Sequence, residues 1–81
     1  MADLDRIIEK IEEVSENVEL SKRVKDKLNK ICSDLKDEKQ DIGVRVTSAI
    51  YELDTISNDS SIPVDIKTIL WNLIGELERV I

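Results

Sequence analysis

The chain has 81 residues, of which 41% are hydrophobic and 37% are charged, and its 18 acidic and 12 basic residues give a net charge of −6. This length supports a single domain spanning residues 1–81, and the composition excludes a disordered chain. The chain has no histidine, which removes the commonest general base and the commonest metal ligand. We therefore expect no enzymatic activity, no catalytic residues, no metal site and no cofactor.

The first half of the chain shows two apolar stripes with helical spacing. Leu4 begins a stripe that predicts a helix over residues 3 to 17, and Ser21 is a suitable cap for a second helix that ends near Lys36. The only cysteine, Cys32, lies on the second stripe and has no partner for an internal disulfide. We expect Cys32 to be a structural core residue, because reactive thiols need an electropositive and accessible setting.

The second half of the chain repeats this pattern. The stripe that begins at Ile42 predicts a helix over residues 40 to 57, and a polar segment then leads to Pro63, which is well suited to the first turn of a helix. We expect this last helix to run almost to Ile81, with Ile69 and Leu70 on its apolar stripe. No stretch alternates with period two, so no sheet is expected.

The four segments predict an all-α fold of two antiparallel helical hairpins, one over residues 3–36 and one over residues 40–80. An offset of 42 residues aligns the two halves, for example Val14 with Ile56. Such a period is compatible with a HEAT-like tandem repeat. Any two amphipathic hairpins also align by their stripes, so a four-helix array without tandem origin remains the alternative.

Three segments of the second half have a distinctive sequence. They are Val44 to Ile50 (Val-Arg-Val-Thr-Ser-Ala-Ile), Leu53 to Asp59 (Leu-Asp-Thr-Ile-Ser-Asn-Asp), and Ile62-Pro63 followed by Ile69 to Leu73 (Ile-Leu-Trp-Asn-Leu). They resemble Uncharacterised Protein Family 0147, a small archaeal group, over residues from about 7 to 80. The first half matches only in pattern and lacks a proline that the family often carries between Val18 and Ser21. The resemblance implies an all-helical fold and an archaeal cytoplasm, and it implies no activity.

The compartment and several partner classes are also constrained by the sequence. The acidic N-terminal residues do not resemble a signal peptide, and no apolar run approaches the roughly 20 residues of a membrane span. We expect a cytoplasmic protein with no membrane association. The acidic net charge disfavours DNA as a partner, because phosphate contacts need a basic face.

One basic segment stands out within this acidic chain. It supplies the RNA-contacting residues of an alternative function, an RNA- or ribosome-associated accessory protein: Lys22, Arg23, Lys25 and Lys30. The ordinary interpretation is that these charges complement the acidic first helix and form local pairs, Glu19 with Arg23 and Asp26 with Lys30. No aromatic residue is interleaved there to stack on a base.

Both aromatic residues lie on the side of their helices opposite the apolar stripes. At about 100° per residue, Trp71 falls there together with other small or apolar residues, and Tyr51 does the same on the preceding helix. The predicted interface consists of Val64, Thr68, Trp71, Gly75, Val44 and Tyr51. Exposed aromatics and a glycine suit a close protein contact, most simply a homodimer. The alternative is that the end of the last helix or the N-terminal segment covers Trp71 within the chain. The function we favour from sequence is therefore a non-enzymatic, self-associating interaction or scaffold module.

Overall fold

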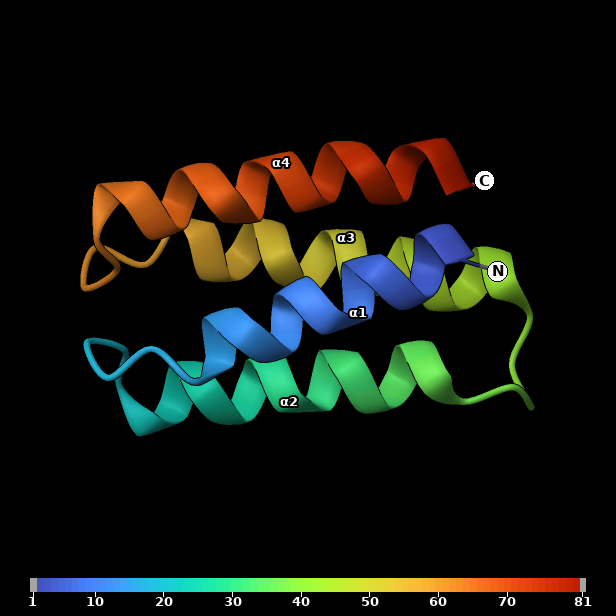
Figure 1. The fold of residues 1–81 in the computed structure, drawn as a ribbon, viewed down its shortest axis with the longest axis horizontal. Helices are drawn as coiled ribbons and strands as arrows, with labels where there is room; N and C mark the ends of the chain where they lie inside the picture. The colour runs from blue at the N-terminus through green and yellow to red at the C-terminus, as the bar shows by residue number, and fades with distance from the viewer. Residues whose placement is uncertain (1, 81) are drawn as a thin grey trace.

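The computed structural model describes residues 2–80 and contains four helices (Figure 1). They are α1 (Ala2–Ser15), α2 (Lys22–Lys36), α3 (Ile42–Ser57) and α4 (Val64–Val80). No strand occurs between residues 2 and 80. The predicted all-α fold class is confirmed.

Consecutive helices run in opposite directions, with the first and third connections at one end of the molecule and the second at the other end (Figure 1). α1 packs against α2 and α4, and α3 packs against the same two helices. Within the described residues, the diagonal pairs make no close backbone contact. The helices therefore form a closed bundle in which each helix has two neighbours.

This closed bundle differs from HEAT-like stacking. Tandem stacking would place equivalent helices side by side, α1 on α3 and α2 on α4, whereas these pairs lie on the diagonals of the bundle. Each helix carries one apolar stripe, and four stripes can be buried together around a single axis. A local likeness between the halves remains, because the buried hydroxyls of Ser15 and Ser57 each donate a hydrogen bond to the carbonyl three residues earlier, at 2.6 and 2.8 Å.

The three connections share one backbone design. Each contains an Asn or Asp whose side-chain oxygen accepts a hydrogen bond from the N–H two residues later and whose carbonyl accepts one from the N–H three residues later. These residues are Asn17, Asp37 and Asp59, and the next helix begins five residues after each of them. The turns shorten two predicted helices: α1 ends at Ser15 and not near 17, and α3 begins at Ile42 and not near 40.

The predicted stripes meet in one hydrophobic core. Leu20 and Ile62 reach this core from the first and third connections and close one end of the bundle. Two stripe residues are exposed, Ile42 at 36% and Ile69 at 37%. Three others are partly buried and pack against the core, namely Ile50, Ile74 and Val80. Ile69 lies at the edge of its stripe, where a helical wheel overestimates the width of the buried face, whereas Ile42 is the first residue of α3, at the end of the helix.

Candidate interaction surface

One line of residues on the outward side of α4 forms the candidate surface, which we call the α4 strip. It consists of Val64, Thr68, Trp71 and Gly75. Val64 is exposed and the Trp71 side chain is 55% exposed. The described side chains therefore leave about half of Trp71 accessible, and they do not form the intrachain cover that was the alternative to an interface.

Gly75 lies one turn after Trp71 in the interior of α4. A Cβ added at Gly75 would meet no atom of another part of the molecule within 4 Å. Glycine in a helix interior is less stable than alanine by about 0.5–1 kcal/mol, and the packing of the monomer gives no reason for that cost. The position leaves room for a backbone or a large side chain to approach from outside.

Trp71 lines a shallow groove between α1 and α4. Three cations surround this groove, namely Arg6, Lys10 and Arg79, and the guanidinium of Arg6 lies 3.6 Å from the carboxylate of Glu76. This cationic edge was not predicted from the sequence, although Arg6 and Lys10 are spaced by one helical turn and are the only bases in α1.

The α3 part of the predicted interface lies elsewhere. Tyr51 is 73% exposed, and it lines a separate groove between α2 and α3 together with Lys27, Lys30 and Ile56. Val44 is also exposed on α3. The structure thus leaves all the predicted interface residues accessible, but it does not bring Trp71 and Tyr51 into one groove.

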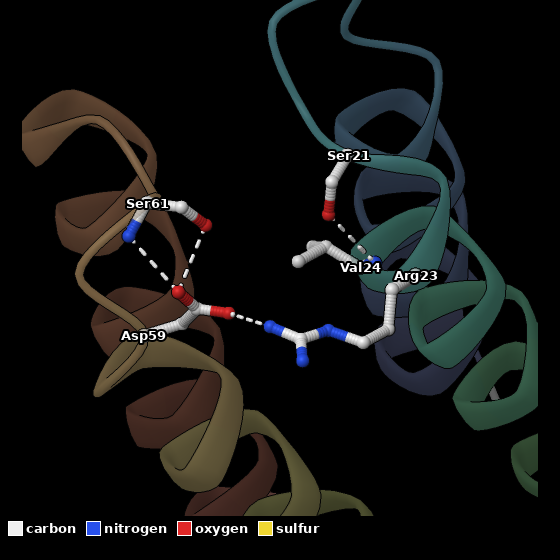
Figure 2. A network of polar contacts seen from close by, with 5 residues as sticks. All are labelled: Ser21, Arg23, Val24, Asp59 and Ser61. Carbon is white, nitrogen blue, oxygen red and sulfur yellow. Dashed lines mark hydrogen bonds and ion pairs between the residues drawn. The ribbon is translucent and has the colours of Figure 1, made fainter.

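The basic side chains of α2 are partly engaged within the molecule. Arg23 forms an ion pair with Asp59 of the last connection (Figure 2), and the N–O distance is 2.8 Å. The ammonium group of Lys30 lies 3.4 Å from the carboxylate of Glu52 in α3. Lys36 pairs with Glu12 of α1 at 2.9 Å, which is the predicted complement across the α1–α2 contact.

The predicted local pairs, Glu19 with Arg23 and Asp26 with Lys30, are absent from the ion pairs of the described chain. Arg23 and Lys30 lie on the flank of α2 that faces α3, so acids distant in sequence are closer to them. Lys22 is exposed and Lys25 is half-buried, and neither forms an ion pair with the described residues. Only these two of the four proposed RNA contacts are unpaired in this way.

Cys32 is buried in α2, and its Sγ lies 3.9 Å from the carbonyl oxygen of Ile8. Burial raises the pKa of the Cys32 thiol to about 11, with a further contribution from the charge of Glu12 that is opposed by Lys36. A thiol with so high a pKa carries almost no thiolate near neutral pH, so Cys32 is a poor nucleophile.

Two further features of residues 2–80 bear on function. No group of three or more Cys, Asp or Glu side chains in this range is arranged to hold a metal ion. None of the described helices combines the length and the apolar character that crossing a bilayer requires.

The flanks of the α4 strip carry four charged side chains that take part in none of the ion pairs among residues 2–80. They are Asp65, Lys67, Glu78 and Arg79. These four residues were not predicted from the sequence, because the order of charges along α4 has a consequence only when a second helix packs beside it.

Comparison with known proteins places the chain among archaeal relatives. A family model described as "Uncharacterised protein family (UPF0147)" matches residues 1–80. A UPF0147 protein of Methanosarcina mazei is 29% identical over 70 residues, which cover 86% of this chain and 75% of that protein. A UPF0147 protein of Archaeoglobus fulgidus is 26% identical over 80 residues, covering 95% of this chain and 87% of that protein. The crystal structure of the unknown function protein MMP1188 is similar with a TM-score of 0.87 and 30% identity, over 94% of this chain and 86% of that one.

Proposed function

The chain belongs to the uncharacterised protein family UPF0147, as its second half indicated, and we propose that it is a non-enzymatic interaction module that self-associates through the α4 strip. The function of the family is unassigned, so the proposal depends on the geometry of this molecule. It takes over the predicted interface residues on α4 and leaves out Val44 and Tyr51, because Tyr51 lines a groove on another side of the bundle.

The proposal is carried by one observation, the adjacency of Trp71 and Gly75 on an uncovered helix face. Trp71 is half exposed, and beside it Gly75 has open space where a side chain would otherwise be. Tryptophan is enriched at interface hot spots because it buries a large area at low entropic cost. Glycine beside it allows a second helix to come close.

A non-enzymatic role agrees with the chemistry of the described side chains. The chain has no histidine, and the pKa of its one thiol is raised to about 11 by burial. General acid–base and nucleophilic catalysis both need groups whose pKa values lie near the working pH.

Self-association suits a domain of this size. A chain of about this length buries only about 60% of its surface on folding, and an interface adds apolar area that the monomer lacks. The acidic net charge disfavours RNA as the partner. In addition, Arg23 and Lys30 of the alternative site are already paired with Asp59 and Glu52.

The test is the solution mass, measured by light scattering from about 5 μM to about 500 μM protein, with Trp71 emission recorded on the same samples. The wild type is expected to reach dimer mass as its emission shifts to the blue. Trp71→Ala should remain monomeric over this range, and Tyr51→Ala, which removes the other exposed aromatic residue, should behave as the wild type does. A wild-type monomer at the highest concentration, or equal effects of the two variants, contradicts the proposal.

A further inference from the structure

We infer that this self-association is an antiparallel pairing of α4 with α4 of a second copy, about a two-fold axis beside Trp71 and Asn72. The inference rests on the function proposed above and adds the orientation and register of the contact. The charges that flank the α4 strip and the open space at Gly75 support a pairing of the two helices, and the helix dipoles favour its antiparallel direction.

The flanking charges fall on two sides of the α4 strip. Lys67 and Glu78 are eleven residues apart, close to three full helical turns, so they share one flank. Asp65 and Arg79 are fourteen residues apart, close to four turns, and share the other flank. Arg79 lines the groove between α4 and α1, which assigns the second flank to the α1 side.

When two copies of α4 run in opposite directions, each basic residue of one copy lies opposite an acidic residue of the other. In an antiparallel two-fold pair, residues on the same flank meet when they lie equally far from the axis on opposite sides. Counted from residue 72, Lys67 lies five residues before and Glu78 six residues after, while Asp65 and Arg79 lie seven residues before and after. Each copy therefore sets Lys67 against Glu78 of the second copy and Asp65 against Arg79 of the second copy.

The uncharged residues of the α4 strip fit the same register. Thr68 lies four residues before position 72 and Gly75 three residues after it, so Thr68 of one copy meets Gly75 of the other. Two small residues at this level let the helix backbones approach closely. The Trp71 rings of the two copies meet next to the axis, where aromatic pairs are favourable.

A parallel pairing is the competing arrangement. It would place Lys67 beside Asp65 of the second copy and Glu78 beside Arg79 of the second copy. It would also bring like ends of the two helix dipoles together, which is unfavourable, whereas antiparallel helices set opposite ends side by side. Both arrangements therefore place opposite charges side by side, and the helix dipoles favour the antiparallel pair. The two arrangements assign different partners to Lys67.

The experiment exchanges charges across the axis. Lys67→Glu and Glu78→Lys are each expected to raise the dimer dissociation constant about tenfold or more, because each turns two attractive contacts into repulsive ones. An equimolar mixture of the two variants should regain wild-type dimer mass, since every Lys67–Glu78 contact in the mixed dimer is again between opposite charges. Recovery in the mixture also shows that both variants are folded.

Matched controls separate this register from a general effect of net charge. Lys39→Glu and Glu38→Lys make the same charge changes in the exposed second connection, and they should leave the dissociation constant unchanged. If the wild type dimerises but the α4 variants behave like these controls, or their mixture gains no mass, the antiparallel register is wrong while the proposed self-association stands. A wild-type monomer at about 500 μM would overturn both.

Discussion

Arg23 at the start of α2 donates a hydrogen bond to Asp59 in the third connection, across 36 residues of sequence and a distance of 2.8 Å. The other carboxylate oxygen of Asp59 accepts hydrogen bonds from the N–H and the hydroxyl of Ser61, at 2.9 and 2.8 Å (Figure 2). Asp59 therefore both forms the turn that leads into α4 and links that turn to α2. The pKa of Asp59 is lowered, first by the backbone hydrogen bond from Ser61, then by its hydroxyl, and finally by Arg23.

Asp59→Asn should isolate the charge from the turn. An asparagine can accept the same backbone hydrogen bond, as Asn17 does in the first connection, so the turn is kept while the ion pair is lost. Because the pKa of Asp59 is lowered in the folded state, its contribution to stability is present above the ordinary value of 3.8 and is lost as the pH falls through the folded value. Thermal unfolding at pH 7 should show a midpoint a few degrees or less below the wild type, since exposed ion pairs contribute little.

This difference should vanish at pH values well below 3.8, where the carboxyl is protonated in both states. Asp37→Asn is the matched control, because Asp37 forms the same turn in the second connection and takes part in none of the ion pairs of the described chain. A difference between wild type and Asp59→Asn that stays constant with pH would contradict the role of the charge.

Gly75→Ala should have opposite effects on the stability of the monomer and on self-association. Since the new methyl group meets open space, the free energy of unfolding of the monomer should rise by about 0.5–1 kcal/mol, measured by urea titration at low concentration. The same methyl group should weaken self-association, measured by light scattering. Gly43→Ala is the control in α3: its Cβ would lie 3.0 Å from the Asp41 oxygen that caps the helix, so a smaller gain or a loss is expected. Equal changes in the free energy of unfolding and in self-association for Gly75→Ala and Gly43→Ala would contradict the role proposed for Gly75.

The sequence was sufficient to predict the helices and most of the core, because apolar spacing reports which side of a helix is buried. It could not predict how the two hairpins pack against each other, because an apolar stripe shows which side of a helix is buried but not which helix covers it. For this reason the sequence predicted Glu19 as the partner of Arg23, whereas the structure pairs Arg23 with Asp59. The separation of Tyr51 from Trp71 was missed for the same reason. A helical wheel places both residues on the outward sides of their helices, but the two residues line different grooves.

RNA binding by α2 is expected to be weak. Two of the four basic residues proposed for it are paired with acids, and the net charge of −6 repels a polyanion. Filter binding of a labelled oligouridine at 0.15 M salt should give a dissociation constant no tighter than about 10⁻⁴ M. Lys22→Glu combined with Lys25→Glu should leave it unchanged, whereas tight retention that these changes abolish would restore the RNA-associated function.

Cys32 should be protected from thiol reagents in the folded protein. With the pKa of the thiol raised to about 11 from an ordinary value of 9.0, the thiolate fraction at pH 8 falls about a hundredfold, and burial adds a steric barrier. Labelling with Ellman's reagent should be at least about a hundredfold slower than in 6 M guanidinium chloride. Because the pKa of Cys32 is raised in the folded state, the contribution of the protonated thiol to stability is present below pH 9 and is lost as the pH rises through about 11. Rapid labelling of the native protein would show that α2 exposes this position.

Ile69 and Leu70 are neighbours on the apolar stripe predicted for the last helix, and the structure separates them. Leu70 is fully buried, whereas Ile69 is 37% exposed at the edge of the stripe. Leu70→Ala should lower the free energy of unfolding by about 3–5 kcal/mol, because it removes buried methyl groups and leaves a cavity. Ile69→Ala should cost less than about 1 kcal/mol, because solvent already reaches that side chain. Urea titration of both variants tests the rotation of α4 about its own axis. Similar losses would mean that Ile69 faces the core as much as Leu70 does, in contradiction to its observed exposure.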